Sequence, residues 1–254
     1  KIQSELKEDR SKETINQILK SLSKIEVLLE IMNRCPLPDL EIEALLVAIR
    51  KRILIERESI EWGSDTRKFL EALAIQCFTN EYAYYVDAFE KRELKSLEKV
   101  VGQTLYDGSM PTEIEIICLA CYRSLHDYEW STSLVFPESL RSLRERQISN
   151  VVREVKLKSE IPVLLGGVDE VSRTVQNQYE QNPYPRWIDI SIPDRVTTFA
   201  EYIETQNVRI PFLPILNEQF KDVLIAGCGT GQQVLELAYR YSDARFLAID
   251  LSLK

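Results

Sequence analysis

The sequence predicts a mostly helical protein that ends in a single β-α-β unit. From the N-terminus to about residue 160, apolar residues recur at helical spacing and strand-type alternation is nearly absent. Proline and glycine then interrupt the chain over residues 161–221, and residues 222–254 have the pattern of strand, glycine loop, helix and strand. We therefore predict an all-helical domain at residues 1–160, a connector at 161–221 and the start of an α/β domain at 222–254.

The composition excludes several classes of protein. With 254 residues, the chain is long enough to bury a core without disulfides or metals. It carries 40 acidic and 32 basic residues and a net charge of −8, which argues against a nucleic-acid binder. No apolar run approaches the ~18 residues of a membrane span. An odd number of cysteines, mostly among apolar neighbours, is typical of reduced thiols and predicts a cytoplasmic protein.

Apolar spacing and breakers place the helices of the first domain. One long helix is expected over residues 15–32, because its apolar residues form a single stripe, and Pro36 and Pro38 would end it. Asp39 is a candidate N-cap for a second helix, and a third follows the break at Gly63. Further helices are expected over residues 81–101, 112–125 and 138–149. The helices do not align with the TPR pattern, so we expect an irregular bundle. The second and third helices should bury Ile42, Leu45, Leu46, Ile49, Ile53, Leu73 and Cys77.

Two groups of residues in this domain allow a chemical and a structural interpretation. Cys118 and Cys121 form a C-x-x-C pair, but they lie inside a predicted helix and no second cysteine pair completes a zinc site. We expect them to pack in the core, and we predict no metal site. Clustered basic residues are interpreted as solvated helix faces: Arg50, Lys51, Arg52, Arg141, Arg144 and Arg146.

The loop Gly227-Cys228-Gly229-Thr230-Gly231 predicts a nucleotide-type cofactor. Glycine lets the backbone approach a ligand where a strand turns directly into a helix. Asp250 follows the next strand, at the position that faces ribose hydroxyls in open α/β sheets. A dinucleotide fingerprint would need glycine at position 232, where this chain has Gln232. The loop therefore favours an adenosine linked through a sulfonium over a pyrophosphate.

Residues 223–231 and 246–250 resemble the first two motifs of class I S-adenosylmethionine-dependent methyltransferases. The resemblance is closest to bacterial members with a helical, often TPR-containing, N-terminal region, and residues 74–82 and 178–187 are also similar to that group. It implies a Rossmann-like domain, the cofactor S-adenosyl-L-methionine, and a methyl acceptor that the sequence does not identify. A nicotinamide cofactor is the second choice. Gly227, Cys228, Gly229, Thr230 and Gly231 would admit the cofactor, and Asp250 would accept hydrogen bonds from its ribose.

The aromatic segment from Tyr179 to Trp187 has two interpretations. It is either a rigid buttress on the sheet, or a lid in which Tyr179, Tyr184 and Arg186 reach the methionine part of the cofactor. Its prolines fix an extended path in both cases.

Two departures from the family pattern limit the function that the resemblance implies. Ile225 and Ala226 stand where many members have an acidic residue. The chain also stops at Lys254, just past the second strand, so we expect an inactive fragment without an identifiable catalytic base. Its sheet should associate with a second copy or be covered by residues 183–212. The alternative function is a helical module that binds a protein partner and carries a vestigial cofactor fold.

Overall fold

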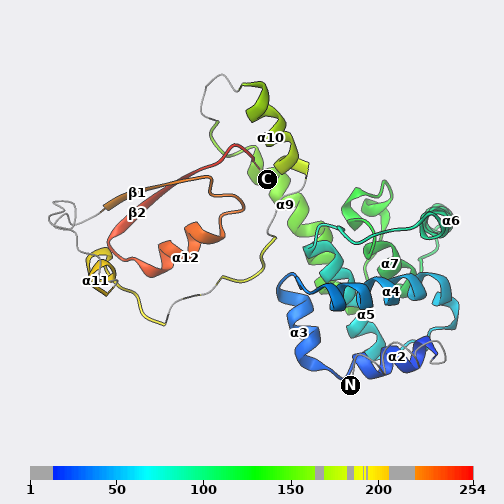
Figure 1. Cartoon of the computed structure of the whole chain (residues 1–254). Coiled ribbons are helices and arrows are strands. Elements are labelled where there is room, and N and C mark those ends of the chain that lie inside the picture. The colour runs from blue at the N-terminus through cyan, green and yellow to red at the C-terminus, as the bar shows by residue number, and fades with distance from the viewer. Residues whose placement is uncertain are drawn as a thin grey trace. The chain divides into compact units, whose positions relative to one another are not determined.

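The computed structural model describes residues 14–163, 169–181, 186–190, 192, 194–205 and 221–253 (Figure 1). The chain divides into two compact units, Lys1–Leu157 (unit 1) and Lys158–Lys254 (unit 2). The described residues are mostly helical, with one small parallel sheet of two strands. Among them, no helix combines the length and the apolar character that crossing a membrane requires.

The described part of unit 1 consists of helices and short helical turns. The α-helices described there are α2 (Ile15–Leu22), α3 (Glu26–Arg34), α4 (Leu40–Glu56), α5 (Ser64–Thr79), α6 (Ala88–Tyr106), α7 (Glu113–Ala120), α8 (Arg141–Arg144) and α9 (Asn150–Lys158). Four 3-10 turns join them: η1 (Arg57–Ser59), η2 (Leu125–Asp127), η3 (Ser131–Ser133) and η4 (Glu138–Leu140). One π-helical turn, η5 (Glu145–Ser149), lies between α8 and α9.

Side-chain caps fix where several of these helices begin. The Asp39 carboxylate accepts the N–H groups of Glu41 and Ile42, which confirms it as the N-cap of α4. Reciprocal capping boxes begin α2, α6 and α7, where an N-cap side chain and a residue three positions later bond each other's backbone. These contacts satisfy backbone N–H groups that have no partner within the helix.

The core of unit 1 is organised around α5. This helix packs against α2, α3, α7 and α8, and every residue from Phe69 to Thr79 except Glu71 is buried. The predicted core residues Leu46, Ile49, Ile53, Leu73 and Cys77 are buried in one cluster, while Ile42 and Leu45 are partly buried against it. Cys118 and Cys121 are also buried there, so the prediction that they pack in the core is confirmed.

Several predicted helix boundaries are wrong. Helix α7 ends at Ala120 rather than at residue 125, and the helix expected over residues 138–149 is a 3-10 turn, α8 and a π-helical turn that continue into α9. The expected long helix over residues 15–32 breaks between α2 and α3, where the Ser23 hydroxyl donates to Lys20 O and competes with the helical pattern. The helix expected from residue 81 begins at Ala88. Glu81 and Tyr82 instead have φ values of +51° and +55°, in the left-handed region. Tyr84 is buried and Tyr82 is partly buried against the core, so tertiary packing overrides a helical path at this turn.

Unit 2 contains a β-α-β unit and two preceding helices. Strands β1 (Lys221–Ala226) and β2 (Ala244–Ile249) pair in parallel, with Val223 opposite Phe246, and α12 (Gln232–Arg240) crosses between them. Helices α10 (Glu170–Gln181) and α11 (Phe199–Thr205) come before the first strand. Leu224 and Leu247 lie directly opposite each other and are 60% and 64% exposed.

The described part of the connector packs on this β-α-β unit. Phe199 and Tyr202 place their rings edge-on to Tyr241, with ring centres 5.5 and 5.6 Å away. Phe199 N also donates to Asp243 Oδ1 at 2.9 Å, and Lys221 Nζ lies 2.7 Å from Asp243 Oδ2. Asp243 therefore joins the connector to the beginning of both strands. Whether a second copy also covers the sheet remains a prediction.

Leu46 provides a test of the core of unit 1. Leu46→Asp would place an unpaired charge at a fully buried position and should unfold the unit. Leu40→Asp on the same helix is the control, because Leu40 is 84% exposed and an acidic residue is favourable in the first turn. We expect circular dichroism to show loss of helix in the first variant only. A Leu46→Asp variant with an unchanged melting temperature would contradict this core.

Asp243 predicts a response of unit 2 to acid. Burial alone would raise the pKa of its carboxyl, but the Lys221 ammonium and the Phe199 N–H hold that pKa below its ordinary value of 3.8. A lowered folded-state pKa contributes stability that is present above the ordinary value and lost as the pH falls through the folded value. We expect Asp243→Asn to remove this acid-dependent loss from calorimetric unfolding curves recorded at pH values from ~5 down to ~2.

The control for this measurement is Asp222→Asn. Asp222 makes an ion pair with Arg245, and the Arg245 and Asp222 side chains are 70% and 74% exposed. Because both partners are solvated, we expect a smaller change. Equal changes in the two variants would contradict the role of Asp243.

Candidate functional site

The glycine loop joins β1 to α12 through three residues in the left-handed region. Gly227, Gly229 and Gly231 have φ values of +74°, +52° and +85°. A Cβ built at each of them would meet nothing within 4 Å. The backbone conformation, rather than a crowded contact, therefore requires glycine here. The space beside all three Cα atoms is open to a ligand.

Backbone hydrogen bonds fix the loop to the end of β2. Gly227 N and Cys228 N both donate to Ile249 O, at 2.8 and 3.2 Å, and Gly231 N donates to Cys228 O at 3.0 Å. Gly229 N donates to Asp250 Oδ2 at 2.8 Å. Four N–H groups of the loop are thus used within the protein.

Asp250 lies at the exposed tip of β2, beside the loop. Its second oxygen, Oδ1, accepts a hydrogen bond from Ser252 N at 2.9 Å. Each carboxylate oxygen can accept a further hydrogen bond, because a carboxylate has about four acceptor positions in total. Two backbone contacts therefore orient Asp250 and leave it able to accept bonds from two hydroxyls.

Helix α10 is hydrogen-bonded to the residues that follow β2. Gln176 Nε2 donates to Leu251 O at 2.7 Å, and Glu180 Oε1 accepts from Leu253 N at 2.6 Å and from the Ser252 hydroxyl at 3.3 Å. Burial alone would raise the pKa of Glu180, but the Lys158 ammonium and these donors hold that pKa below its ordinary range. The turn that orients Asp250 is therefore fixed from α10.

The sequence-predicted site residues are brought together only in part. The five loop residues and Asp250 meet at one end of the sheet. Tyr179 is 52% exposed on α10, Arg186 is partly buried, and Tyr184 lies outside the described residues. Trp187, which was not predicted as a site residue, donates from Nε1 to Thr230 O at 3.0 Å. A tryptophan in a segment already predicted to pack on the sheet was the signal for this contact.

Cys228 is a poor candidate for a nucleophile. Partial burial and the Asp250 carboxylate raise the pKa of its thiol above the ordinary value, which disfavours the reactive thiolate. Among the residues that the structure describes, no group of three or more His, Cys, Asp or Glu side chains could hold a metal ion.

Comparisons with known proteins add no identification. No family model matches the chain, and neither the curated proteins nor the solved structures that were searched include a match.

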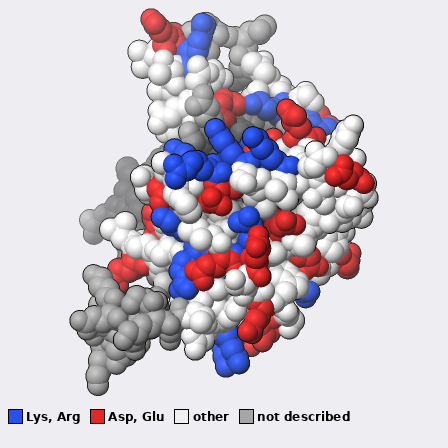
Figure 2. Space-filling view, turned by 90° about the vertical axis from the view of Figure 1, so that its right-hand side faces the viewer, with Lys and Arg blue, Asp and Glu red and all other residues white. Residues whose placement is uncertain are grey.

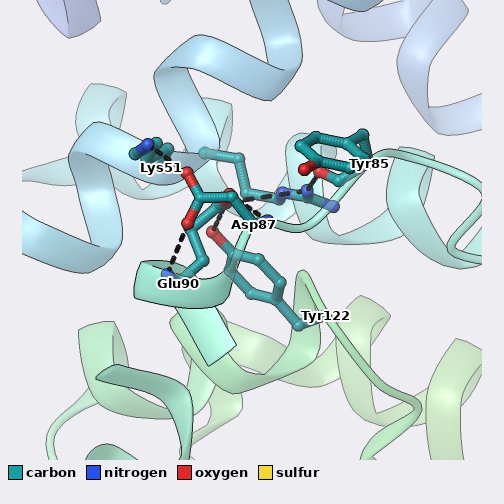
Figure 3. A network of polar contacts seen from close by, with 6 residues as sticks. Lys51, Tyr85, Asp87, Glu90 and Tyr122 are labelled. Carbon is teal, nitrogen blue, oxygen red and sulfur yellow. Dashed lines mark hydrogen bonds and ion pairs between the residues drawn. The ribbon is translucent and has the colours of Figure 1, made fainter. Parts of the chain in front are cut away.

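Unit 1 contains a second polar cluster, centred on Arg50 (Figure 3). The prediction that Arg50 lies on a solvated helix face is wrong, because its side chain is 1% exposed. Its Nη2 donates to Tyr85 O at 2.7 Å and lies 3.8 Å from Glu90 Oε1. The Tyr122 hydroxyl donates to the same Glu90 oxygen at 2.8 Å. Burial raises the pKa of the Tyr122 hydroxyl, so the phenol keeps its proton and donates a hydrogen bond to Glu90.

Aromatic rings enclose the rest of the Arg50 guanidinium. Its central carbon lies 4.2 Å from the ring centre of Tyr122 and 5.6 Å from that of Tyr84. Its Nε and Nη1 atoms have no hydrogen-bond partner. Cation–π attraction therefore replaces hydrogen bonds on this side of the guanidinium. Helical spacing could have revealed this burial, since Leu46, Ile53 and Leu54 lie four positions before, three after and four after Arg50.

The cluster holds the strained turn before α6 against α4. Asp87, the N-cap of α6, makes an ion pair with Lys51 on α4. Its carboxylate also accepts a hydrogen bond from Glu90 N, and its own N–H donates to the Glu90 carboxylate. Arg50 binds the carbonyl of Tyr85 within the same turn. Because Arg50 and Glu90 are buried and the groups of the cluster are paired with one another, we assign them a structural role.

Arg50 and Arg52 provide a matched test of that role. Arg50→Ala would leave the Glu90 carboxylate buried without its cation and should reduce the free energy of unfolding by about 3–5 kcal/mol. Arg52 pairs with Glu56 one turn along α4, and both side chains are about one-third exposed. Arg52→Ala should therefore cost at most about 1 kcal/mol. Urea unfolding followed by circular dichroism measures both, and similar losses would contradict the buried pair.

Proposed function

We propose that the chain belongs to an S-adenosylmethionine-dependent methyltransferase and that unit 2 carries the first part of its cofactor site. The three left-handed glycines and Asp250, joined by the bond from Gly229 N to Asp250 Oδ2, carry this proposal. They leave open space beside the backbone next to an oriented carboxylate, as a ribose with two hydroxyls requires.

The hydrogen bonds of the loop distinguish two cofactor classes. A pyrophosphate is held by backbone N–H groups that point at the ligand. Here the N–H groups of Gly227, Cys228, Gly229 and Gly231 all donate to protein oxygens. These four N–H groups are therefore not available to a pyrophosphate. Together with Gln232 at the place of the third fingerprint glycine, this supports S-adenosylmethionine over a nicotinamide dinucleotide.

Different residues would bind different parts of the cofactor. The glycine loop would admit the adenosine, Asp250 would accept its ribose hydroxyls, and Trp187 would hold Thr230 in place through its indole N–H. Tyr179, Tyr184 and Arg186 stay candidates for the methionine part. The cofactor supplies a methyl group on a sulfonium, and the protein contributes by positioning donor and acceptor.

The competing function is an interaction module in which unit 2 no longer binds a cofactor. Unit 1 has its own core, as such a module needs. The open loop beside Asp250 favours the methyltransferase, and cofactor binding separates the two hypotheses. The methyl acceptor and self-association through the sheet remain proposals.

Asp250→Ala tests the proposed site. The variant should weaken S-adenosylmethionine binding by about 1.5–3 kcal/mol, the range for hydrogen bonds to a charged group. This corresponds to at least about tenfold in Kd by calorimetry. Asp222→Ala is the control, because Asp222 lies near the start of β1, at the end of the strand away from the glycine loop, and pairs with Arg245 in solvent.

Two outcomes would contradict the proposal. If the unaltered chain does not bind S-adenosylmethionine at millimolar concentration, the interaction module is the better hypothesis. If it binds and Asp250→Ala leaves Kd unchanged while circular dichroism shows the same fold, Asp250 is not part of the site.

A further inference from the structure

The exposed face of α6 carries a row of cations in an acidic protein. Lys91, Arg92, Lys95 and Lys99 are all exposed, whereas the chain as a whole has a net charge of −8. Figure 2 shows Lys and Arg side chains gathered in a band on the side of the molecule where Figure 1 places α6. We call Lys91, Arg92, Lys95 and Lys99 the basic stripe.

The geometry of α6 lines these cations up. Lys91, Lys95 and Lys99 are four residues apart, so they lie along one side of the helix at intervals of about 6 Å. Two of the three acidic residues of the helix lie away from this side, since Glu90 is buried and Glu93 is partly buried. Glu98 borders the stripe, seven residues after Lys91, but its carboxylate lies 3.5 Å from Arg123 rather than in an ion pair with a lysine of the stripe.

Nothing in the described structure neutralises the stripe. No described acidic side chain makes an ion pair with any of its four members; Arg92 only lies over the ring of Phe89, at 5.7 Å. Like charges four residues apart destabilise a helix, and cations near its N-terminus oppose the helix dipole. The arrangement is therefore unfavourable in the isolated unit and would become favourable beside an anionic surface.

We propose that the basic stripe is a docking surface for an acidic amphipathic helix of a protein partner. Carboxylates at every fourth position of such a helix would repeat at the same interval of about 6 Å as the lysines. Exposed Phe89, Val100 and Tyr106 add apolar surface to the same helix. This interaction is independent of the cofactor site proposed in unit 2.

The extent and surroundings of the stripe favour a helix over a longer polyanion. The three lysines span only about 12 Å of helix axis, which two turns of a partner helix cover. A nucleic acid or a membrane would extend beyond the stripe into the field of a chain with excess negative charge. A short acidic helix matches the stripe and avoids that repulsion.

The test uses the whole chain and a synthetic helical peptide of about 20 residues with glutamate at every fourth position. Binding is measured by fluorescence anisotropy at low and at physiological salt. The variant Lys91→Gln/Lys95→Gln/Lys99→Gln removes three charges and keeps good helix formers. The matched control is Lys20→Gln/Lys24→Gln/Lys68→Gln, which makes the same change in net charge at three exposed lysines outside α6.

We expect the stripe variant to weaken peptide binding about tenfold or more and the control to change it less than about twofold. Affinity of the unaltered chain should fall as salt rises. Equal weakening by both triple variants would show a response to net charge alone and would overturn the proposal. It would also be overturned if the unaltered chain does not bind the peptide at millimolar concentration. Tighter binding to single-stranded DNA or to phosphatidylserine vesicles than to the peptide would overturn the acidic-helix assignment.

Discussion

The burial of α5 from Phe69 to Thr79 is the constraint on which unit 1 depends. A helix covered on nearly all sides cannot leave polar groups to water, so each must find a partner inside the protein. Gln147, on the π-helical turn η5, donates from Nε2 to Ala74 O on α5 and to Ala120 O on α7, and accepts from Leu125 N. When the side-chain amide of Gln76 on α5 is oriented with its NH2 group toward the neighbouring carbonyls, it donates to Met32 O and Cys35 O. Two glutamines therefore join the surrounding elements to the central helix.

This burial also explains why buried polar residues of unit 1 such as Gln147 and Arg50 occur at positions where partners surround them. Gln147 can reach both carbonyls because the π-helical turn widens the chain locally before α9. Arg50 can be buried because a carbonyl, a carboxylate and two aromatic rings surround it. The strained left-handed turn at Glu81 and Tyr82 persists because these contacts fix the residues that follow it.

Periodicity and caps predicted most of the helical fold and the core positions on α4 and α5. They failed where a tertiary contact overrides a local pattern. The capping box at Asp87 and the buried aromatic residues determine where α6 begins, although the sequence before it is compatible with a helix. In the same way, three basic residues in a row suggested solvent, whereas the apolar spacing around Arg50 points its side chain inward.

The candidate site was predictable to a similar extent. Glycine spacing and the strand-tip aspartate were sufficient to place the loop beside Asp250. The partners of Glu180 and Trp187 were not predictable, although Trp187 itself signalled packing, because α10 and the connector approach the sheet from distant parts of the sequence. Local patterns carry no information on such long-range hydrogen bonds.

The bond from Trp187 to Thr230 has a spectroscopic consequence. The chain contains three tryptophans, and the other two, Trp62 and Trp130, belong to unit 1. The indole N–H is a donor only, so its surroundings change if the loop moves and Thr230 O is withdrawn. Trp187 is thus a built-in fluorophore at the glycine loop, and once Trp62 and Trp130 are replaced by phenylalanine its emission reports on this part of unit 2 without an attached dye.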